Sequence, residues 1–423
     1  MPDQVPVEGH PGPVFPPVPA DRALAELVDD LAGRAAEYDR TATFPAESIA
    51  AVHRAGVLTA TVGSRYGGPG AGLVETVRLL RALGRGDPSV ALIASMTLAT
   101  HAGQARRGTW PAALYRRVLA DSLAGPALVN ALQVEPELGT PSRGGVPATT
   151  ATPVAGGGWL LNGRKTFSTG APGLRWMLVL ARTPDEPPRV GTFAVRADAP
   201  GITIEPTWAH LGMRASASHD VVLRDAPVAT DAVVELSAGG TTVASQDPAT
   251  RVWGNAAIPA VYLGVAEAAR DWLVRFLHER TPANLGRPLA SLPRFESALG
   301  EIQVRLIEAA ELLRGLAERV DASGGEASAT APEPTAPHPA SADLGATGRA
   351  TKLLVNRAVI WAVEYAVSLV GNPGLSQHNP LQRHLRDVLC SRVHFPQEDT
   401  VVTELGRAAL ARFPAPTPIG RSA

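Results

Sequence analysis

The order of residue patterns along the chain is the feature that most restricts its fold. Helical segments come first, β-rich segments follow, and long helices then return. From about Asp21 to Asp121, apolar residues recur at three- and four-residue spacing, which is the period of an amphipathic helix. The stretch Ser89–Gly103 is nearly all small or apolar and predicts a buried helix. Helices and strands that are segregated in this way are typical of an α+β protein and argue against a doubly wound sheet.

The middle of the chain predicts strands. From about Leu128 to Val234, short β-rich runs alternate with Gly, Pro and Asn, a spacing that predicts an antiparallel sandwich or barrel. Within it, Asn162-Gly163 predicts a hairpin turn. Long helical patterns follow Val252, and the low-complexity segment 321–347 predicts a flexible loop between two of them. We therefore expect a Pro-rich arm at 1–20, a helical domain at 21–127, a β domain at 128–234 and a helical bundle at 250–423.

Composition excludes several classes of function. The 423 residues carry a formal net charge of −1 and one cysteine, so neither a polyanionic partner nor a disulfide framework within the chain is expected. No stretch predicts a signal peptide or a membrane span, and a cytoplasmic location is expected. The chain has no GxGxxG after a strand, no GxxxxGK[ST], no HExxH and no paired CxxC. A Rossmann domain, a P-loop and a metal site are therefore not expected.

Four stretches, in order, resemble the acyl-CoA dehydrogenase superfamily along nearly the whole chain. The first is Ala131–Thr140, and the second, with the strongest match, is Trp159–Gly173. The third is Leu211–Val228, with the pattern Leu-Gly-x-Arg-x-Ser, and the fourth is the C-terminal helical region. This resemblance implies an N-terminal helical domain, a central antiparallel β domain, a C-terminal four-helix bundle and a flavin cofactor. It also implies a homo-oligomer, specifically a tetramer.

A flavin needs an aromatic or apolar wall, donors for its polar rim and cations for its phosphates. Phe167 is placed to stack near the ring, and Ser168 and Thr169 are placed to bond its edge. By the resemblance, the segment around Val134 and Thr140 also contacts the cofactor. The resemblance further implies that Arg280 and the turn Gly371–Gly374 bind the pyrophosphate across a subunit interface.

Two departures fall on the distal part of the cofactor site. Arg280–Gly286 reads RTPANLG, whereas the family has Arg-x-x-Phe-Gly, and Asn372 stands where the family has a glycine. Both changes leave open whether the flavin is FAD, or FMN supplied in reduced form by a reductase.

The catalytic base of a dehydrogenase of this type is missing. Such an enzyme needs a carboxylate in a dry pocket to remove a proton from its thioester substrate. In most relatives a Glu follows a Tyr shortly after an Arg-Asp pair, but here these two positions are His394 and Phe395. In a minority of relatives the Glu lies early in the first bundle helix, where this chain has Gly254. Glu398 and its neighbour Asp399 are close by, but they are also expected simply to begin the last helix.

The segment Arg392–Pro396 resembles a different branch of the superfamily, the flavin monooxygenases of the dibenzothiophene type, to which amino-sugar N-oxygenases are related. In that branch a His occupies the place of His394, and another pocket His falls at His101. A neutral His exchanges protons readily near pH 7, and Ser168 would add a hydrogen bond. We interpret these three residues as candidate catalytic groups. Trp208 is either a pocket wall or an ordinary core residue.

Three functions remain in competition. The first is a two-component monooxygenase that oxidises a small organic substrate with reduced flavin from a separate reductase. The second is an acyl-CoA dehydrogenase with a relocated base such as Glu398, which would pass electrons to a partner protein. The third is a non-catalytic flavin-binding or assembly subunit. Lys165 is interpreted as a turn or surface cation rather than a catalyst.

Overall fold

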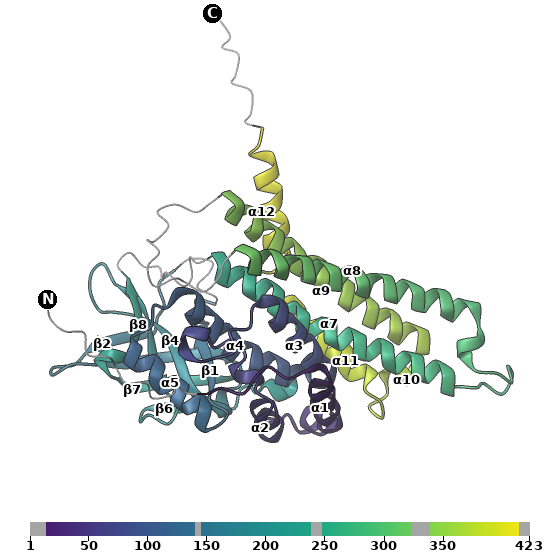
Figure 1. The fold of residues 1–423 in the computed structure, drawn as a ribbon, viewed down its shortest axis with the longest axis horizontal. Helices are drawn as coiled ribbons and strands as arrows, with labels where there is room; N and C mark the ends of the chain where they lie inside the picture. Colours follow the sequence, from purple (N-terminus) through teal and green to yellow (C-terminus); the bar gives the residue numbers. More distant parts are fainter. Residues whose placement is uncertain (1–13, 140–144, 238–247, 324–338, 414–423) are drawn as a thin grey trace, which may run out of the picture.

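The computed structural model describes residues 14–139, 145–237, 248–323 and 339–413. Helices and a single sheet are segregated as the sequence predicts, with the sheet at one end of the molecule and the long helices at the other (Figure 1). The N-terminal helices lie between them. The structure therefore confirms the α+β class.

Five helices form the first part of the chain. Ser89–Gly103 lies within α4, and its buried side chains include Val90, Ile93 and Leu98, so the predicted buried helix is confirmed. The carboxylate of Asp87 accepts the backbone N–H of Ser89 at 2.8 Å and so caps this helix. The helices are α1 (Asp21–Thr41), α2 (Ala46–Arg54), α3 (Leu73–Gly86), α4 (Pro88–Arg107) and α5 (Ala112–Ala124).

The β region is one sheet in the order β6-β7-β3-β2-β4-β5-β8, with β1 paired to β4. Most pairs are antiparallel, as expected, but β1 and β2 both run parallel to β4. The parallel pairs arise because the chain leaves β1 and β2 and returns to β4 through longer connections. The strands are β1 (Leu128–Leu132), β2 (Thr150–Pro153), β3 (Trp159–Ser168), β4 (Leu174–Arg182), β5 (Val190–Arg196), β6 (Ile202–Glu205), β7 (His219–Val228) and β8 (Val233–Ser237).

The predicted hairpin turn at Asn162-Gly163 is wrong. Both residues lie inside β3, where the pairing with β7 shifts register between Leu161 and Gly163. The Asn162 side chain exchanges hydrogen bonds with the backbone N–H and carboxylate of Asp225 at 2.9 and 2.8 Å. Gly163 has φ of +156°, and a Cβ there would lie 2.4 Å from Oγ1 of Thr149. The dipeptide therefore forms a β-bulge, a structure that, like a hairpin turn, often contains a glycine.

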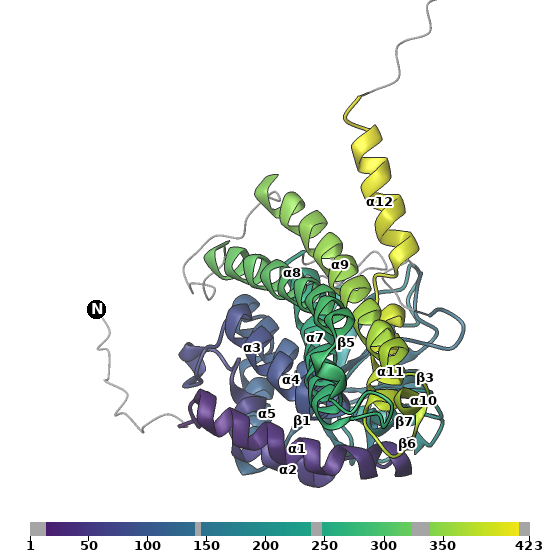
Figure 2. The same cartoon turned by 90° about the vertical axis from the view of Figure 1, so that its right-hand side faces the viewer.

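Long helices form the C-terminal bundle. The last of them, α12, projects away from the rest of the chain (Figures 1 and 2). Both ends of the predicted loop 321–347 are helical: α8 extends to Ser323, α9 begins at Pro339, and residues 324–338 lie outside the described part. Asp321 instead caps α3, because its carboxylate accepts the N–H of Leu73 at 2.7 Å. The helices are α7 (Pro248–Glu279), α8 (Pro293–Ser323), α9 (Pro339–Val370), α10 (Asn372–Leu375), α11 (Leu381–Leu389) and α12 (Glu398–Leu410).

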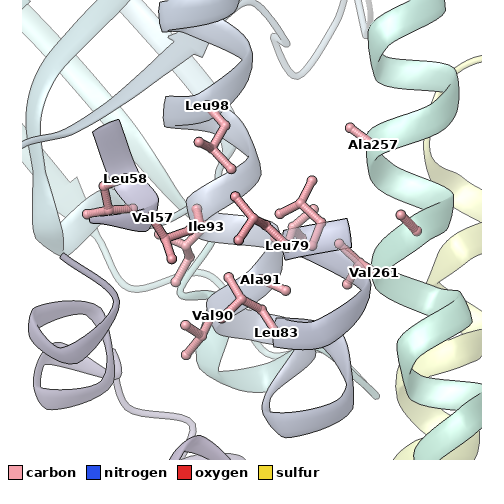
Figure 3. Close-up of a cluster of buried hydrophobic side chains, with 14 of the residues drawn as sticks. Val57, Leu58, Leu79, Leu83, Val90, Ala91, Ile93, Leu98, Ala257 and Val261 are labelled. Carbon is pink, nitrogen blue, oxygen red and sulfur yellow. The ribbon is translucent and has the colours of Figure 1, made fainter. Parts of the chain in front are cut away.

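The bundle is joined to the first helices through an apolar seam. Leu79 and Leu83 of α3 are buried on the side toward α7, which contributes Ala257 and Val261, whereas Ile93 of α4 lies beside Val57 and Leu58 (Figure 3). The helices approach closely because α3 has a glycine at the contact: a Cβ on Gly84 would lie 2.2 Å from the carbonyl oxygen of Val261. Within the described residues, one stretch, 344–370 of α9, is long and apolar enough to span a membrane, and half of it is buried inside the protein.

Candidate active site

The end of β3 leaves the regular pairing of the sheet. The pairing with β7 shifts register between Lys165 and Ser168, and Phe167 has φ of +55°. A left-handed backbone is unusual for an aromatic residue and marks a locally constrained segment. The backbone N–H of Thr166 is satisfied by the carbonyl oxygen of Val134 at 3.0 Å, so two segments that resemble flavin-binding stretches lie side by side.

Hydroxyl and amide groups gather at this strand end. Ser168 is buried, and its Oγ has no hydrogen-bond partner among the described residues. The Thr169 hydroxyl accepts from Oγ of Ser218 at 3.1 Å, and the Thr169 carbonyl oxygen accepts from Nδ2 of Asn130 at 3.0 Å. An orphaned buried hydroxyl is expensive unless a ligand completes it. The Ser168 hydroxyl therefore fits the rim of a bound cofactor.

Aromatic side chains form a wall beside this cluster. Phe167 is 57% exposed, and its ring meets the edges of Trp208 and His210 with centroid distances of 6.3 and 6.2 Å. Trp208 and His210 are stacked at 3.5 Å, and Nε1 of Trp208 donates to the carbonyl oxygen of Met213 at 3.0 Å. An exposed ring held beside polar groups suits a flat aromatic ligand. These residues fit a flavin.

The loop that carries Met213 ties the sheet to the bundle. The backbone N–H of Met213 donates to the carboxylate of Asp387 on α11 at 2.6 Å. Gly212 allows this approach, since a Cβ there would lie 2.2 Å from the carbonyl oxygen of Arg386. Burial raises the pKa of Asp387 to about 7, although the Met213 N–H opposes the shift. The loop that carries Met213 is therefore bonded to α11, the helix that precedes the segment with His394.

His394 follows α11 and is hydrogen-bonded to Tyr262 of α7. The distance between its Nε2 and the Tyr262 hydroxyl is 2.6 Å. Burial, helped by the charge of Lys352, lowers the pKa of His394 to about 4, and burial raises the pKa of Tyr262 well above its ordinary value. At neutral pH the pair is therefore an uncharged imidazole and a protonated phenol, able to exchange a proton with a third group.

His101, on α4, is a fully buried histidine. Its Nδ1 lies 3.0 Å from the hydroxyl of Tyr115, and its Nε2 has no partner among the described residues. Burial lowers its pKa to about 4. Thr97, one turn earlier on the same face of α4, bonds the backbone of Val129 in β1 at 3.0 Å. The histidine is therefore on the side of α4 that faces β1, the strand that contains Asn130.

The positions of the usual base hold no carboxylate. Phe395 and Gly254 occupy them, and Glu398 begins α12, as the sequence also allowed. Glu398 is 55% exposed and pairs with Nε of Arg357 at 3.0 Å. A solvent-exposed, paired carboxylate is a poor general base, because both water and the guanidinium stabilise its ionised form.

The residues expected to hold the cofactor's phosphates lie elsewhere. Arg280, Gly371 and Asn372 are all exposed, and α7 ends, like α10, toward the end of the bundle away from the sheet (Figure 1). The structure does not bring them together with Ser168. Thr140 lies outside the described residues.

The sequence predicted that Lys165 is a turn or surface cation, and this prediction is wrong. It is fully buried, and its Nζ lies 2.6 Å from the carboxylate of Glu135. That carboxylate also accepts from Oγ1 of Thr149 at 2.6 Å. Burial lowers the pKa of Lys165 to about 8. The pair fixes the segment that contains Val134 against β3.

Comparison with known proteins identifies the family. Three family models match in order: the acyl-CoA dehydrogenase N-terminal domain at 20–110, the middle domain at 135–226 and the C-terminal domain at 256–397. YdbM of Bacillus subtilis (strain 168), whose name assigns it provisionally to the acyl-CoA dehydrogenases, is 32% identical over 91% of this chain and 95% of its own. The chain belongs to the acyl-CoA dehydrogenase family. Members of this family are flavin-dependent oxidoreductases, so the predicted enzyme class is confirmed.

This family member is also similar to a nitrososynthase and to the solved structure of KijD3. L-evernosamine nitrososynthase of Micromonospora sp. is 30% identical over 88% of this chain and 86% of its own. The structure of KijD3 in complex with FMN and a dTDP-linked amino sugar has a TM-score of 0.78 and 30% identity, and the match covers 95% of each chain. The chain is therefore similar both to a protein named as an acyl-CoA dehydrogenase and to one named as a nitrososynthase.

Sequence reasoning missed three site residues. Asn130, Tyr262 and Lys352 are ordinary polar residues in β1, α7 and α9, and no local pattern distinguishes them. Their partners lie 39, 132 and 42 residues away. The one available signal was a polar residue inside an otherwise apolar run, which also describes many core residues.

Proposed function

We propose that this protein is a two-component flavin monooxygenase that oxidises a heteroatom of a small organic substrate. The observation that carries the proposal is the replacement of the dehydrogenase base. His394, hydrogen-bonded to Tyr262, stands beside the position where a dehydrogenase has its carboxylate, and that position is Phe395. The amino-sugar nitrososynthases among the relatives support a nitrogen substrate as the first class to examine.

Phe167, Ser168 and Thr169 would hold the flavin, with the aromatic ring as a wall and the Ser168 hydroxyl as the donor that lacks a partner. Bound in its reduced form, the flavin supplies two electrons and activates oxygen; one oxygen atom enters the substrate and the other leaves as water. Such chemistry requires that bulk water be excluded; Ser168 is buried, whereas the 57% exposed ring of Phe167 would be covered by the flavin itself. FMN is present in the KijD3 structure, so we propose FMN, with FAD as the alternative.

His394 serves as the proton acceptor for the substrate. Its lowered pKa keeps the ring neutral at pH 7. In the tautomer whose Nε2–H donates to the Tyr262 hydroxyl, the Nδ1 lone pair is available for the proton that the heteroatom loses when it is oxidised. Tyr262 fixes the ring through the 2.6 Å contact with Nε2. His101 has a free Nε2 among the described residues and is assigned the second role, a hydrogen bond within the pocket.

The remaining parts of the proposal concern partners. A separate flavin reductase supplies the reduced cofactor in the cytoplasm. Arg280 and the turn at Gly371 and Asn372 are exposed at the far end of the bundle, which supports a cofactor contact from a neighbouring subunit in a homotetramer. A dehydrogenase would instead deliver electrons to an acceptor protein.

The second candidate is an acyl-CoA dehydrogenase with a relocated base, and the 32% identity to YdbM is the observation in its favour. The structure offers little support for Glu398 as that base, because it is exposed and paired with Arg357.

An isotope experiment tests the proposal. The protein is combined with FMN, NADH and a flavin reductase under ¹⁸O₂, with a panel of small amines, including amino sugars, and of small sulfides and phenols. The proposal predicts a product that carries ¹⁸O and forms only when reduced flavin, oxygen and protein are all present. Reoxidation of flavin with no labelled product from any amine, sulfide or phenol in the panel would contradict it.

A further inference from the structure

Lys352 of α9 is a buried lysine whose role is not explained by the cofactor site. Its side chain is almost fully buried, and its Nζ donates to two backbone carbonyl oxygens, that of His394 at 2.9 Å and that of Pro396 at 2.8 Å. These two residues flank Phe395, so a single ammonium group holds the backbone on both sides of the segment that carries the imidazole.

Burying this ammonium is energetically unfavourable. A buried lysine is usually paired with a carboxylate, as Lys165 is with Glu135. Among the described residues Lys352 forms no ion pair within 4 Å. Burial accordingly lowers its pKa to about 8. A lysine kept in such a place without a counter-ion must be retained for its hydrogen bonds or for its charge.

A second residue of the same helix holds the same segment. Asn356 lies four residues after Lys352, on the same face of α9, and its Nδ2 donates to the carbonyl oxygen of Ser391 at 3.0 Å. Two side chains of α9 thus bind three carbonyl groups between Ser391 and Pro396. The segment has little regular backbone pairing of its own, since it consists of a short 3-10 turn followed by extended residues.

We propose that Lys352 is a positioning residue that fixes the backbone around His394 and so keeps the imidazole against Tyr262. The inference rests on the proposed function only in giving His394 a part in the reaction; the positioning itself is a property of the structure. The charge of Lys352 also faces the imidazole and adds to the effect of burial on the pKa of His394. The other titratable group in contact with that ring is the phenol of Tyr262 from α7.

Exchange of the imidazole C2–H for deuterium, followed by mass spectrometry of the peptide that contains His394, tests the proposal. The exchange rate reports the pKa and accessibility of one histidine and needs no turnover. In the flavin-loaded wild type, the rate should be flat above about pH 5, because the pKa of His394 is about 4. In Lys352→Met the pH at the midpoint of the exchange profile should move toward 6.5, the ordinary pKa of a histidine, and the limiting exchange rate should rise. Lys352→Arg, which keeps charge and donors, should restore most of the wild-type profile.

Arg357→Met is the matched control, because it removes a cation of the same helix whose polar contact with the described C-terminal segment is an exposed pair with Glu398. It should leave the His394 profile unchanged. If Lys352→Met does not fold, Lys352→Gln removes the charge in a smaller step and should show the same direction of shift. An unchanged His394 profile in a folded Lys352 variant would overturn the proposal.

Turnover gives a second, separable readout. If the protein oxygenates an amine, kcat in Lys352→Met should fall about ten-fold or more with a smaller change in KM, as expected when a reacting group loses its orientation. If no oxygenation is found in the wild type, the proposed function fails while the exchange profile still decides whether Lys352 positions His394.

Discussion

Replacing Lys165 with Met should destabilise the protein more strongly than its position in a β-hairpin region suggests. Lys165 is fully buried and bonded to Glu135 at 2.6 Å, and Glu135 is itself 3% exposed. Removing the lysine leaves a buried carboxylate with Thr149 and the backbone N–H groups of Ala148 and Thr149 as its only described partners.

The expected loss follows from the burial of both groups. Breaking a buried ion pair by removing one partner typically costs about 3–5 kcal/mol, because the other charge is left uncompensated. The remaining donors to Glu135 place the expected value near the lower end, at about 3 kcal/mol. The double variant Lys165→Met/Glu135→Gln should be less destabilised than the sum of the two single variants, since it leaves no unpaired charge.

Urea unfolding followed by tryptophan fluorescence measures these losses, with Trp159 and Trp176 as reporters within the sheet. Arg117→Met is the control, because its pair with Asp231 is 45% and 48% exposed and should contribute at most about 1 kcal/mol. A loss in Lys165→Met no larger than that in Arg117→Met would refute the reasoning. So would strict additivity in the double variant.

The remaining predictions concern the site. His394→Ala should lower the oxygenation rate by about 10²–10⁴-fold with little change in flavin affinity, measured by steady-state turnover and fluorescence titration; unchanged turnover would exclude His394. In the wild type, the rate of the step that needs neutral His394 should stay constant as pH falls from 7 and should decrease only near pH 4, because the lowered pKa of His394 keeps the ring unprotonated above that value. A rate that halves near pH 6.5 would contradict this. Ser168→Ala should weaken flavin binding about ten-fold, whereas the matched Ser122→Ala, which removes a hydroxyl bonded within α5, should not. Glu398→Gln should leave turnover unchanged. If a thioester instead reduces the flavin of the wild type and not that of this variant, the dehydrogenase hypothesis is restored.

The fold was predictable where side-chain periodicity and burial agree. The apolar stretch Ser89–Gly103 has to be a buried helix, and it lies in α4. Local turn chemistry was less reliable: Asn162-Gly163 favours a hairpin turn, yet it forms a β-bulge whose Asn162 side chain is bonded to Asp225, far along the sequence. Parallel pairing of β1 and β2 with β4 depends on connections whose path no local pattern encodes.

The site was predictable only where it resembled known motifs. His394 could be found because most relatives have a known residue, a Tyr, at its position. Ser168 could be found because it lies in the stretch with the strongest family match. The environment of each was hidden. Lys165 reads as an exposed cation until Glu135 is placed beside it, and Tyr262 reads as a core aromatic until His394 contacts its hydroxyl. Such pairs depend on tertiary contacts between distant segments, so one sequence does not specify them.

The measurement that tests the central claim most directly is an anaerobic titration of the flavin-loaded protein with acyl-CoA thioesters of several chain lengths, monitored by the absorbance of oxidised flavin. No bleaching is expected from any of them, because neither Phe395 nor Gly254 supplies a base and Glu398 is held at the surface by Arg357. Stoichiometric bleaching by any acyl-CoA would contradict the account and show that the chain is a dehydrogenase.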